Sequence, residues 1–262
     1  MFPVNETGAP PPTDVEHSVT DGKWAIPEET PVAIVYNRRN YAVMLATPQD
    51  ITDFAVGFSL TEKIVDSVDE IKALDINWSD RGADLRLKIE DARLKRLDVR
   101  QRRRTLPGNV GCGLCGLENA DELFDPLPRV TAEKISLKHE AVAAAFASLG
   151  DHQPINNRTR TVHAAAWANL YGDIQLARED VGRHNALDKL LGAMALAGAD
   201  MKGGFVVLSS RCSYELVQKS AALGVTALAT ISAPTDFALR KAAEANMALY
   251  ARGPDGVVDI TG

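Results

Sequence analysis

Two cysteines, Cys112 and Cys115, are the side chains of this sequence best suited to chemistry, and they stand in the motif CGLCG. Four glycines give the backbone around them unusual freedom: Gly108, Gly111, Gly113 and Gly116. Four arginines lie upstream and would favour the thiolate, lowering a pKa that is about 8.5 in a free cysteine: Arg100, Arg102, Arg103 and Arg104. A thiolate can accept sulfur as a persulfide and pass it on. Cys115 would then shield or resolve a persulfide on Cys112.

Other uses of a cysteine pair fit the sequence less well. A zinc site needs about four ligands, so zinc would require Cys212, distant histidines or a second subunit. A zinc nucleobase deaminase needs a His-x-Glu motif before its cysteine pair, and the chain has none. A thioredoxin-like motif would begin a helix after a strand in a different topology. The pattern favours a nucleophilic or sulfur-carrying thiol and leaves a zinc site as an alternative.

The composition narrows the class of protein. The chain has 262 residues, 45% of them hydrophobic, and a formal net charge of −6, which argues against nucleic acid or an anionic membrane as the main partner. Its longest apolar run, Ala141 to Ala147, is too short to span a membrane. No secretory signal is visible. Three cysteines are too few for a disulfide framework. A cytoplasmic location is the default expectation.

One stretch departs from the acidic average. Between Arg86 and Arg104 there are nine Lys or Arg residues and three acids. Such a run is usually a solvated helix face or edge strand. Because this one ends directly before the CGLCG loop, a functional role for it is an equal alternative.

The first half of the chain predicts a small α+β domain over residues 28–128. Residues 1–27 are rich in proline and polar residues and predict a flexible tail. Residues 31–46 alternate as in a hairpin, and residues 51–65 have the apolar spacing of a helix. Two further strands are expected at 71–78 and 83–89.

The second half, residues 129–262, alternates strands and helices. Helices are expected over 137–149, 185–197, 214–223 and 234–247, and strands over 160–170, 174–178, 205–209, 225–231 and 248–252. This rhythm indicates an α/β domain with a largely parallel sheet covered by helices.

Ligands bind such sheets beyond the carboxyl ends of the strands. Three strand-to-helix turns should share that edge, namely residues 179–185, 209–213 and 232–236, and a fourth segment, 252–256, follows the last strand. The turns are rich in hydroxyl groups and arginines, and each precedes a helix whose free N–H groups favour anions. A phosphate-bearing ligand is the resulting hypothesis. His184 has either a chemical or a structural role there, whereas His163 lies in an apolar strand and is more often a core histidine.

Several segments together resemble the formate dehydrogenase accessory sulfurtransferase (FdhD-type) family. In order, the matching residues are Thr47-Pro48, Asp53-Phe54-Ala55-Val56-Gly57-Phe58, Gly111-Cys112-Gly113-Leu114-Cys115-Gly116, Thr161-Val162-His163-Ala164-Ala165-Ala166, Ala177-Arg178-Glu179-Asp180-Val181-Gly182-Arg183-His184-Asn185-Ala186-Leu187-Asp188-Lys189, Ser210-Arg211, Ser213-Tyr214-Glu215-Leu216-Val217-Gln218-Lys219 and Ile231-Ser232-Ala233-Pro234. They run from about residue 28 to the end of the chain.

This resemblance implies a function. Members of the family take sulfur from a cysteine desulfurase as a persulfide and pass it to the molybdenum or tungsten bis(molybdopterin guanine dinucleotide) cofactor destined for formate dehydrogenase. The resemblance also implies a homodimer that binds the cofactor through its guanine ends. The protein itself would contain no structural metal. The second domain would be a three-layer α/β unit with a cytidine-deaminase-like fold.

The resemblance also assigns residues. Cys112 matches the persulfide cysteine and Cys115 its neighbour. The cofactor-contact segment of the family falls on Tyr250, Ala251, Arg252, Gly253, Pro254 and Asp255. From chemistry and position, four further residues are expected to help hold the anionic cofactor: Arg183, His184, Asn185 and Arg211. Cys212 stands where the family usually has alanine, and it is expected to be either a small core residue or a third thiol near the cofactor.

Two alternative functions are open. The first is a chaperone that binds the cofactor without moving sulfur. The second, on weaker grounds, is a zinc-dependent nucleotide deaminase.

Overall fold

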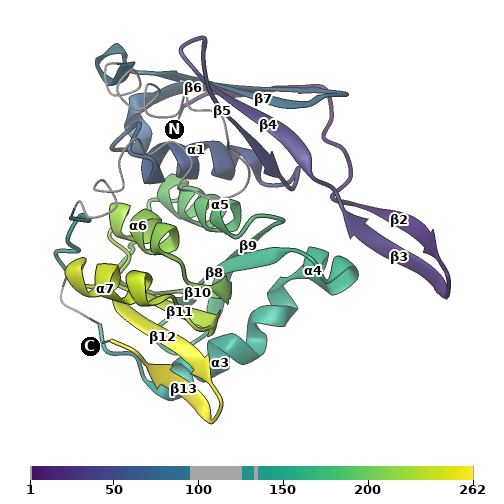
Figure 1. Cartoon of the computed structure of the whole chain (residues 1–262). Helices are drawn as coiled ribbons and strands as arrows, with labels where there is room; N and C mark the ends of the chain where they lie inside the picture. Colours follow the sequence, from purple (N-terminus) through teal and green to yellow (C-terminus); the bar gives the residue numbers. More distant parts are fainter. Residues whose placement is uncertain (1, 95–125, 133–134, 262) are drawn as a thin grey trace.

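The computed structural model describes residues 2–94, 126–132 and 135–261. These residues form an N-terminal lobe (2–94) and a C-terminal lobe (126–261), each built on its own sheet, with helices between the two sheets (Figure 1). The α/β class expected from the sequence is confirmed. Within the described residues, no helix has the length and apolar character needed to cross a membrane.

The N-terminal lobe is a five-stranded sheet with one long helix on its inner face. The sheet order is β1-β6-β7-β4-β5, and the elements are β4 (Thr30–Tyr36), β5 (Arg39–Ala46), α1 (Ile51–Thr61), β6 (Ile71–Ser79) and β7 (Gly82–Ile89). Two short 3₁₀ turns, η1 (Val68–Glu70) and η2 (Asp91–Arg93), flank this β6–β7 pair. Alternate strand residues such as Ile34, Leu74 and Leu85 are fully buried against Phe54 and Phe58 of α1. The hairpin, the helix and the two strands predicted here are therefore confirmed.

The prediction of a flexible tail over residues 1–27 is wrong. Strand β1 (Val4–Thr7) pairs in parallel with β6, and Phe2 is buried in the lobe's core. Strands β2 (Asp14–Val19) and β3 (Gly22–Pro27) form a separate ribbon that projects from the body (Figure 1). Arg158 of the C-terminal lobe pairs with Asp14 at its base. Long-range pairing and one ion pair order a segment whose own composition offers little to bury.

The C-terminal lobe is a six-stranded sheet of order β13-β12-β11-β10-β8-β9. Its strands are β8 (His163–Asn169), β9 (Ile174–Asp180), β10 (Gly204–Arg211), β11 (Ala227–Ser232), β12 (Ala248–Gly253) and β13 (Gly256–Asp259). The sheet is mixed rather than largely parallel, because only β10, β11 and β12 pair in parallel and the other three pairs are antiparallel. Two tight turns, which need few residues, produce the outer antiparallel pairs.

Helices cover both faces of this sheet, as expected for three layers. Helices α5 (Arg183–Leu196), α6 (Tyr214–Ala222) and α7 (Asp236–Glu244) lie on one face, and α3 (His139–Ser148) lies on the other. Strand β10 shows the alternation that makes this possible, since Val206 packs toward α5 and Val207 toward α3. The 3₁₀ turn η4 (Leu149–His152) and α4 (Pro154–Thr159), which sequence periodicity did not predict, follow α3.

Helices α1 and α5 join the two lobes at very close range. A Cβ atom added to Gly57 of α1 would overlap the carbonyl oxygen of Asp188, and one added to Gly192 of α5 would overlap that of Asp53. Glycine is therefore required at both positions by the approach of the two backbones. The motif residue Gly57 thus has a packing role.

We predict that Gly57→Ala lowers the free energy of unfolding by about 3 kcal/mol, because overpacking forces the two helices apart. Gly203→Ala is the matched control, since a Cβ there meets no atom within 4 Å. Urea denaturation measures both. Equal midpoints for the two variants would contradict the required contact.

Candidate functional site

Three strand-to-helix turns meet at one edge of the six-stranded sheet, as the sequence predicts. Strand β9 runs in the same direction as β10, because each is antiparallel to β8, and β11 is parallel to β10. The ends of β9, β10 and β11, and the starts of α5, α6 and α7 that follow them, therefore share this carboxyl edge. The amide of Thr235 donates to the carbonyl of Cys212 at 3.0 Å and ties the second turn to the third.

Asp180, the last residue of β9, organises the first of these turns. Its side chain is fully buried and pairs with Lys189 of α5 at 2.6 Å. The same carboxylate accepts hydrogen bonds from the backbone amides of Thr47 and Gly182, and from the side-chain amide of Asn185, all at 2.8–2.9 Å. These four donors satisfy the buried carboxylate. They are needed because a charge away from water is stable only when it is paired and hydrogen-bonded.

Asn185 and Lys189 serve the contact between the lobes as well as this turn. Asn185 donates to the carbonyl of Leu45 at 2.8 Å, and Lys189 donates to the carbonyl of Thr47 at 2.9 Å. Sequence reasoning expected Asn185 at the cofactor. In the structure its amide nitrogen bonds to Leu45 and Asp180, so its observed role is to position the start of α5.

A second buried network lies farther along α5. Asp188 accepts from Thr61 of α1 at 2.7 Å and from Lys219 of α6 at 2.9 Å. Lys219 also reaches Glu62 at 3.2 Å. Three residues of the Asn185–Lys189 stretch, Asn185, Asp188 and Lys189, therefore hold the lobes together. Their partners in the N-terminal lobe (Leu45, Thr61 and Thr47) lie more than 120 residues away in sequence, so no local pattern could have revealed them.

Two basic side chains, Arg183 and His184, are the first two residues of α5 and lie at this edge. The Nε atom of Arg183 is buried and has no hydrogen-bond partner among the described residues. His184 Nε2 lies 3.8 Å from the Glu215 carboxylate at the start of α6. The nearby His184 holds the pKa of Glu215 at about 2, so Glu215 is ionised at neutral pH.

His163, at the start of β8, belongs to the same cluster. Burial lowers its pKa and the charge of Arg183 lowers it further, while the charge of Asp180 acts in the opposite direction. The sequence favoured a core histidine, but the structure places His163 half-buried, opposite Asp180 in the β8–β9 register. Its strand pattern, which is apolar on both sides, hid this position at the strand's first residue.

The remaining predicted cofactor residues divide by location. Arg211 is exposed at the end of β10 on the same edge. In β12, Tyr250 and Ala251 are buried, and the Tyr250 hydroxyl accepts from the amide of Leu137 at 2.9 Å. The Arg252 guanidinium lies over the Phe146 ring of α3, 5.7 Å from its centroid.

The segment Tyr250–Asp255 thus lies in a different part of the sheet from Arg183. Gly253 ends β12, and Pro254 and Asp255 are exposed in the turn to β13. Four strand spacings separate β9 from β12 in the sheet order, a distance of about 19 Å. Because Arg252 packs on α3, it lies on the opposite face of the sheet from α5. A ligand that touched both groups would have to be long.

Cys112 and Cys115 lie outside the described residues, as do residues 95–104 of the basic run. Cys212 is described and fully buried in the core that α5, α6 and α7 cover. Burial raises the pKa of its thiol to about 12. These observations favour the core interpretation of Cys212 over a third thiol at the cofactor, and they make it a poor zinc ligand.

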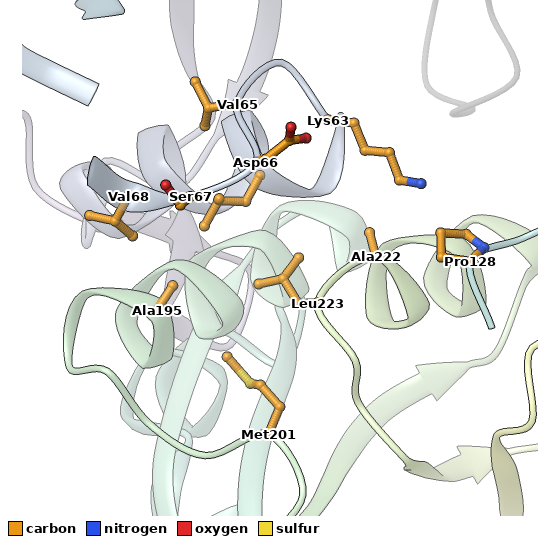
Figure 2. A pocket seen from close by; sticks show the side chains of 11 residues that line it. Lys63, Val65, Asp66, Ser67, Val68, Pro128, Ala195, Met201, Ala222 and Leu223 are labelled. Atoms are coloured by element: carbon orange, nitrogen blue, oxygen red, sulfur yellow. The ribbon is translucent and has the colours of Figure 1, made fainter. Parts of the chain in front are cut away.

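A pocket of about 490 Å³ lies between the lobes at the other edge of the sheet (Figure 2). Ala195, near the end of α5, and Leu223, just after α6, line it from the C-terminal lobe. Asp66 lines it from the N-terminal lobe and pairs with Arg93 at 2.7 Å. Pro128 also lines it, so both described flanks of the cysteine segment lie beside this pocket. No motif in the sequence indicated it.

Comparison with known proteins identifies the family. The model of the FdhD/NarQ family matches residues 27–258. The chain belongs to this family. A sulfur carrier protein FdhD from Xanthomonas euvesicatoria is 46% identical over 232 residues, which is 88% of this chain and 82% of the relative. One of the same name from Agrobacterium fabrum is 44% identical over 242 residues, or 92% and 89% of the two chains.

The fold of this FdhD/NarQ member also has a solved counterpart. A crystal structure described as a formate dehydrogenase accessory protein from Desulfotalea psychrophila aligns with a TM-score of 0.70 at 22% identity. The alignment covers 96% of this chain and 98% of that one. The two proteins share both lobes of the fold.

We predict that Lys189→Met destabilises the protein by about 3–5 kcal/mol, because it leaves the Asp180 charge buried without its cation. Urea denaturation measures the loss. Lys202→Met, at an exposed position, should change the midpoint little. Adding Asp180→Asn to Lys189→Met should recover part of the loss, and a simply additive double variant would contradict the pairing.

Stability should also depend on Glu215 in acid. Because its pKa is lowered, the ionised side chain adds to the free energy of unfolding above the ordinary value of 4.5. This contribution is lost as the pH falls toward about 2. The difference in unfolding free energy between wild type and Glu215→Gln should therefore shrink between pH 4.5 and pH 2. A difference that does not change with pH would contradict the assigned charge.

Proposed function

We propose that this protein is a sulfurtransferase that carries sulfur on Cys112 from a cysteine desulfurase to a molybdenum or tungsten bis(molybdopterin guanine dinucleotide) cofactor destined for formate dehydrogenase. The observation that carries the proposal is membership of the FdhD/NarQ family, with relatives at 42–46% identity named sulfur carrier proteins. The motif CGLCG supplies the thiol that such a carrier needs.

The loading step is a thiol exchange. The Cys112 thiolate attacks the terminal sulfur of a persulfide on the desulfurase, a new S–S bond forms on Cys112, and the desulfurase leaves as a thiolate. No oxidant or reductant is consumed. Cys115 is placed by sequence to shield or resolve the persulfide.

Chain length allows the loaded cysteine to reach a distant acceptor. Cys112 precedes Pro128 by 16 residues, and an extended chain of that length spans at most about 55 Å. Pro128 lies at the amino-terminal edge of the C-terminal sheet, beside the pocket of Figure 2. The carboxyl edge of the same sheet is within that span.

The cofactor is the substrate in this scheme, and the carboxyl edge suits an anionic one. Arg183, His184 and Arg211 gather there, while Asn185 positions the start of α5. Arg252 and the exposed Pro254 and Asp255 lie at the end of β12, four strand spacings (about 19 Å) from the end of β9 and two (about 10 Å) from Arg211 at the end of β10. An elongated dinucleotide can bridge both separations. We propose that both groups contact the cofactor, and that Tyr250, Ala251 and Gly253 shape the strand that presents them.

The setting follows from the same proposal. The carrier acts in the cytoplasm, as a homodimer, with the desulfurase as donor and formate dehydrogenase as the final recipient. A chaperone that holds the cofactor without moving sulfur would use the same edge but not the cysteine. Replacing Cys112 separates the two functions.

We predict that incubation with a cysteine desulfurase and cysteine adds about 32 Da, one sulfur atom, to the intact protein. Cys112→Ala should abolish the adduct. Cys212→Ala is the matched control, since that thiol is buried, and it should keep the adduct.

Intact mass spectrometry with and without a reductant makes the measurement, because a persulfide is removed by thiols. An adduct that survives on Cys112→Ala, or an active dehydrogenase obtained with that variant, would contradict the persulfide mechanism and favour the chaperone.

A further inference from the structure

The ribbon of β2 and β3 turns an apolar face to solvent. Its register pairs Val15 with Ile26 and His17 with Trp24, and directly opposite residues of an antiparallel pair share one face. Val19 lies on this face too, because side chains alternate along a strand. Four large hydrophobic side chains therefore gather there, each between 39% and 48% exposed: Val15, Val19, Trp24 and Ile26.

The opposite face of the ribbon contacts the C-terminal lobe. Asp14, whose register partner is Pro27, pairs with Arg158 of α4. Ala25 and Pro27 lie on this same face and are half-buried, and α4 packs against β3. These contacts hold the ribbon with its apolar face outward. Because a two-stranded ribbon is marginally stable alone in water, a face of this kind indicates an interaction surface.

Strand β5 presents a second apolar surface at the edge of the N-terminal sheet. It is last in the sheet order, so within the described residues one side of its backbone faces no other strand. Val43 is 68% exposed and Leu45 48% exposed, while Ala42 and Met44, on the other face, pack on the core beneath α1. Sheet edges that stay in solvent usually carry charges, whereas β5 has none after Arg39.

The two apolar surfaces do not cover each other within one copy. Trp24 and Val43 are both exposed, and the ribbon projects away from the body of the protein (Figure 1). Only Glu28 and Glu29 separate β3 from β4, so the connection is short, and the contacts with α4 fix the base of the ribbon. In two copies related by a two-fold axis, each ribbon can instead cover the β5 edge of the other.

Charge favours a second copy as the occupant. Residues 14–29, which include the ribbon, hold five acids and one lysine, whereas residues 30–49, which include β5, hold two arginines and no acid. The ribbon of one copy and the β5 edge of another therefore attract each other. A second copy also covers both surfaces at once, whereas an unrelated partner on the ribbon would leave β5 exposed.

The size of the two surfaces is sufficient for a dimer. Their six exposed hydrophobic side chains present about 500 Å² in each copy, so reciprocal cover would bury about 1,000 Å², the area from which specific interfaces begin. Trp24 supplies the large aromatic anchor that such interfaces commonly have.

We infer that the ribbon of one copy packs its apolar face, centred on Trp24, on Val43 and Leu45 of a second copy, and that the exchange is reciprocal. This contact adjoins the carboxyl edge of the C-terminal sheet, because the Leu45 carbonyl accepts from Asn185 at 2.8 Å. The inference gives the homodimer of the proposed function its surface and does not depend on sulfur transfer.

Analytical ultracentrifugation of the full chain over a dilution series tests the contact. We expect wild type to be a dimer, and Trp24→Glu and Val43→Glu each to weaken it at least tenfold, because each charge enters the interface twice. Tyr171→Glu is the matched control, since Tyr171 is 82% exposed in the turn between β8 and β9, and it should dimerise as wild type does. A monomeric wild type, or a dimer that tolerates both substitutions, would overturn the inference.

A double-mutant cycle shows whether the two side chains touch. Trp24→Ala and Val43→Ala should each weaken the dimer and leave the circular dichroism of the folded chain unchanged, since both side chains are exposed in one copy. The double variant should be weakened by less than the product of the two single factors, because both substitutions remove the same contact. Factors that simply multiply would contradict packing of the ribbon on β5.

Loading by the desulfurase separates this inference from the proposed function. If both glutamate variants dissociate and no sulfur adduct forms on wild type, the surface stands and the sulfurtransferase is wrong. If the adduct forms on Cys112 and both variants stay dimeric, the surface alone is wrong.

Discussion

The buried carboxylate of Asp180 is the interaction on which the rest of the structure depends. Asp180 is the last residue of β9. Its carboxylate accepts hydrogen bonds from the backbone amide of Gly182, just before α5, and from that of Thr47 in the other lobe. Lys189 neutralises it from within α5. One charge thus fixes the sheet edge, the helix start and the lobe contact together.

Local patterns predicted most of the elements. The apolar run of β10 and the helical spacing in α5 are properties of short windows, so both were found with boundaries close to those observed. Strand β1 could not be found in this way, because its four residues are exposed and gain order only from pairing with β6, 70 residues away. The mixed sheet was missed for a similar reason, since parallel or antiparallel pairing of β13 depends on a turn rather than on strand composition.

The candidate site shows the same division. The sequence placed the turns after β9, β10 and β11 on one edge, and strand directions bear this out. It could not separate Asn185, which bonds to Leu45 of the other lobe, from Arg183, whose Nε atom has no hydrogen-bond partner in the part of the chain that the structure describes. Both look like polar residues of one motif. Only the distant neighbour of Asn185 in the other lobe shows that this residue holds the fold.

The central claim is that this FdhD/NarQ member moves sulfur rather than only binding a cofactor. A transfer experiment tests it most directly: the chain is loaded by a desulfurase with ³⁵S-cysteine, freed of donor, and mixed with cofactor-containing, inactive formate dehydrogenase. The account predicts that label leaves the carrier and appears in the dehydrogenase cofactor as activity rises. Activity that rises while the label stays on the carrier would contradict it.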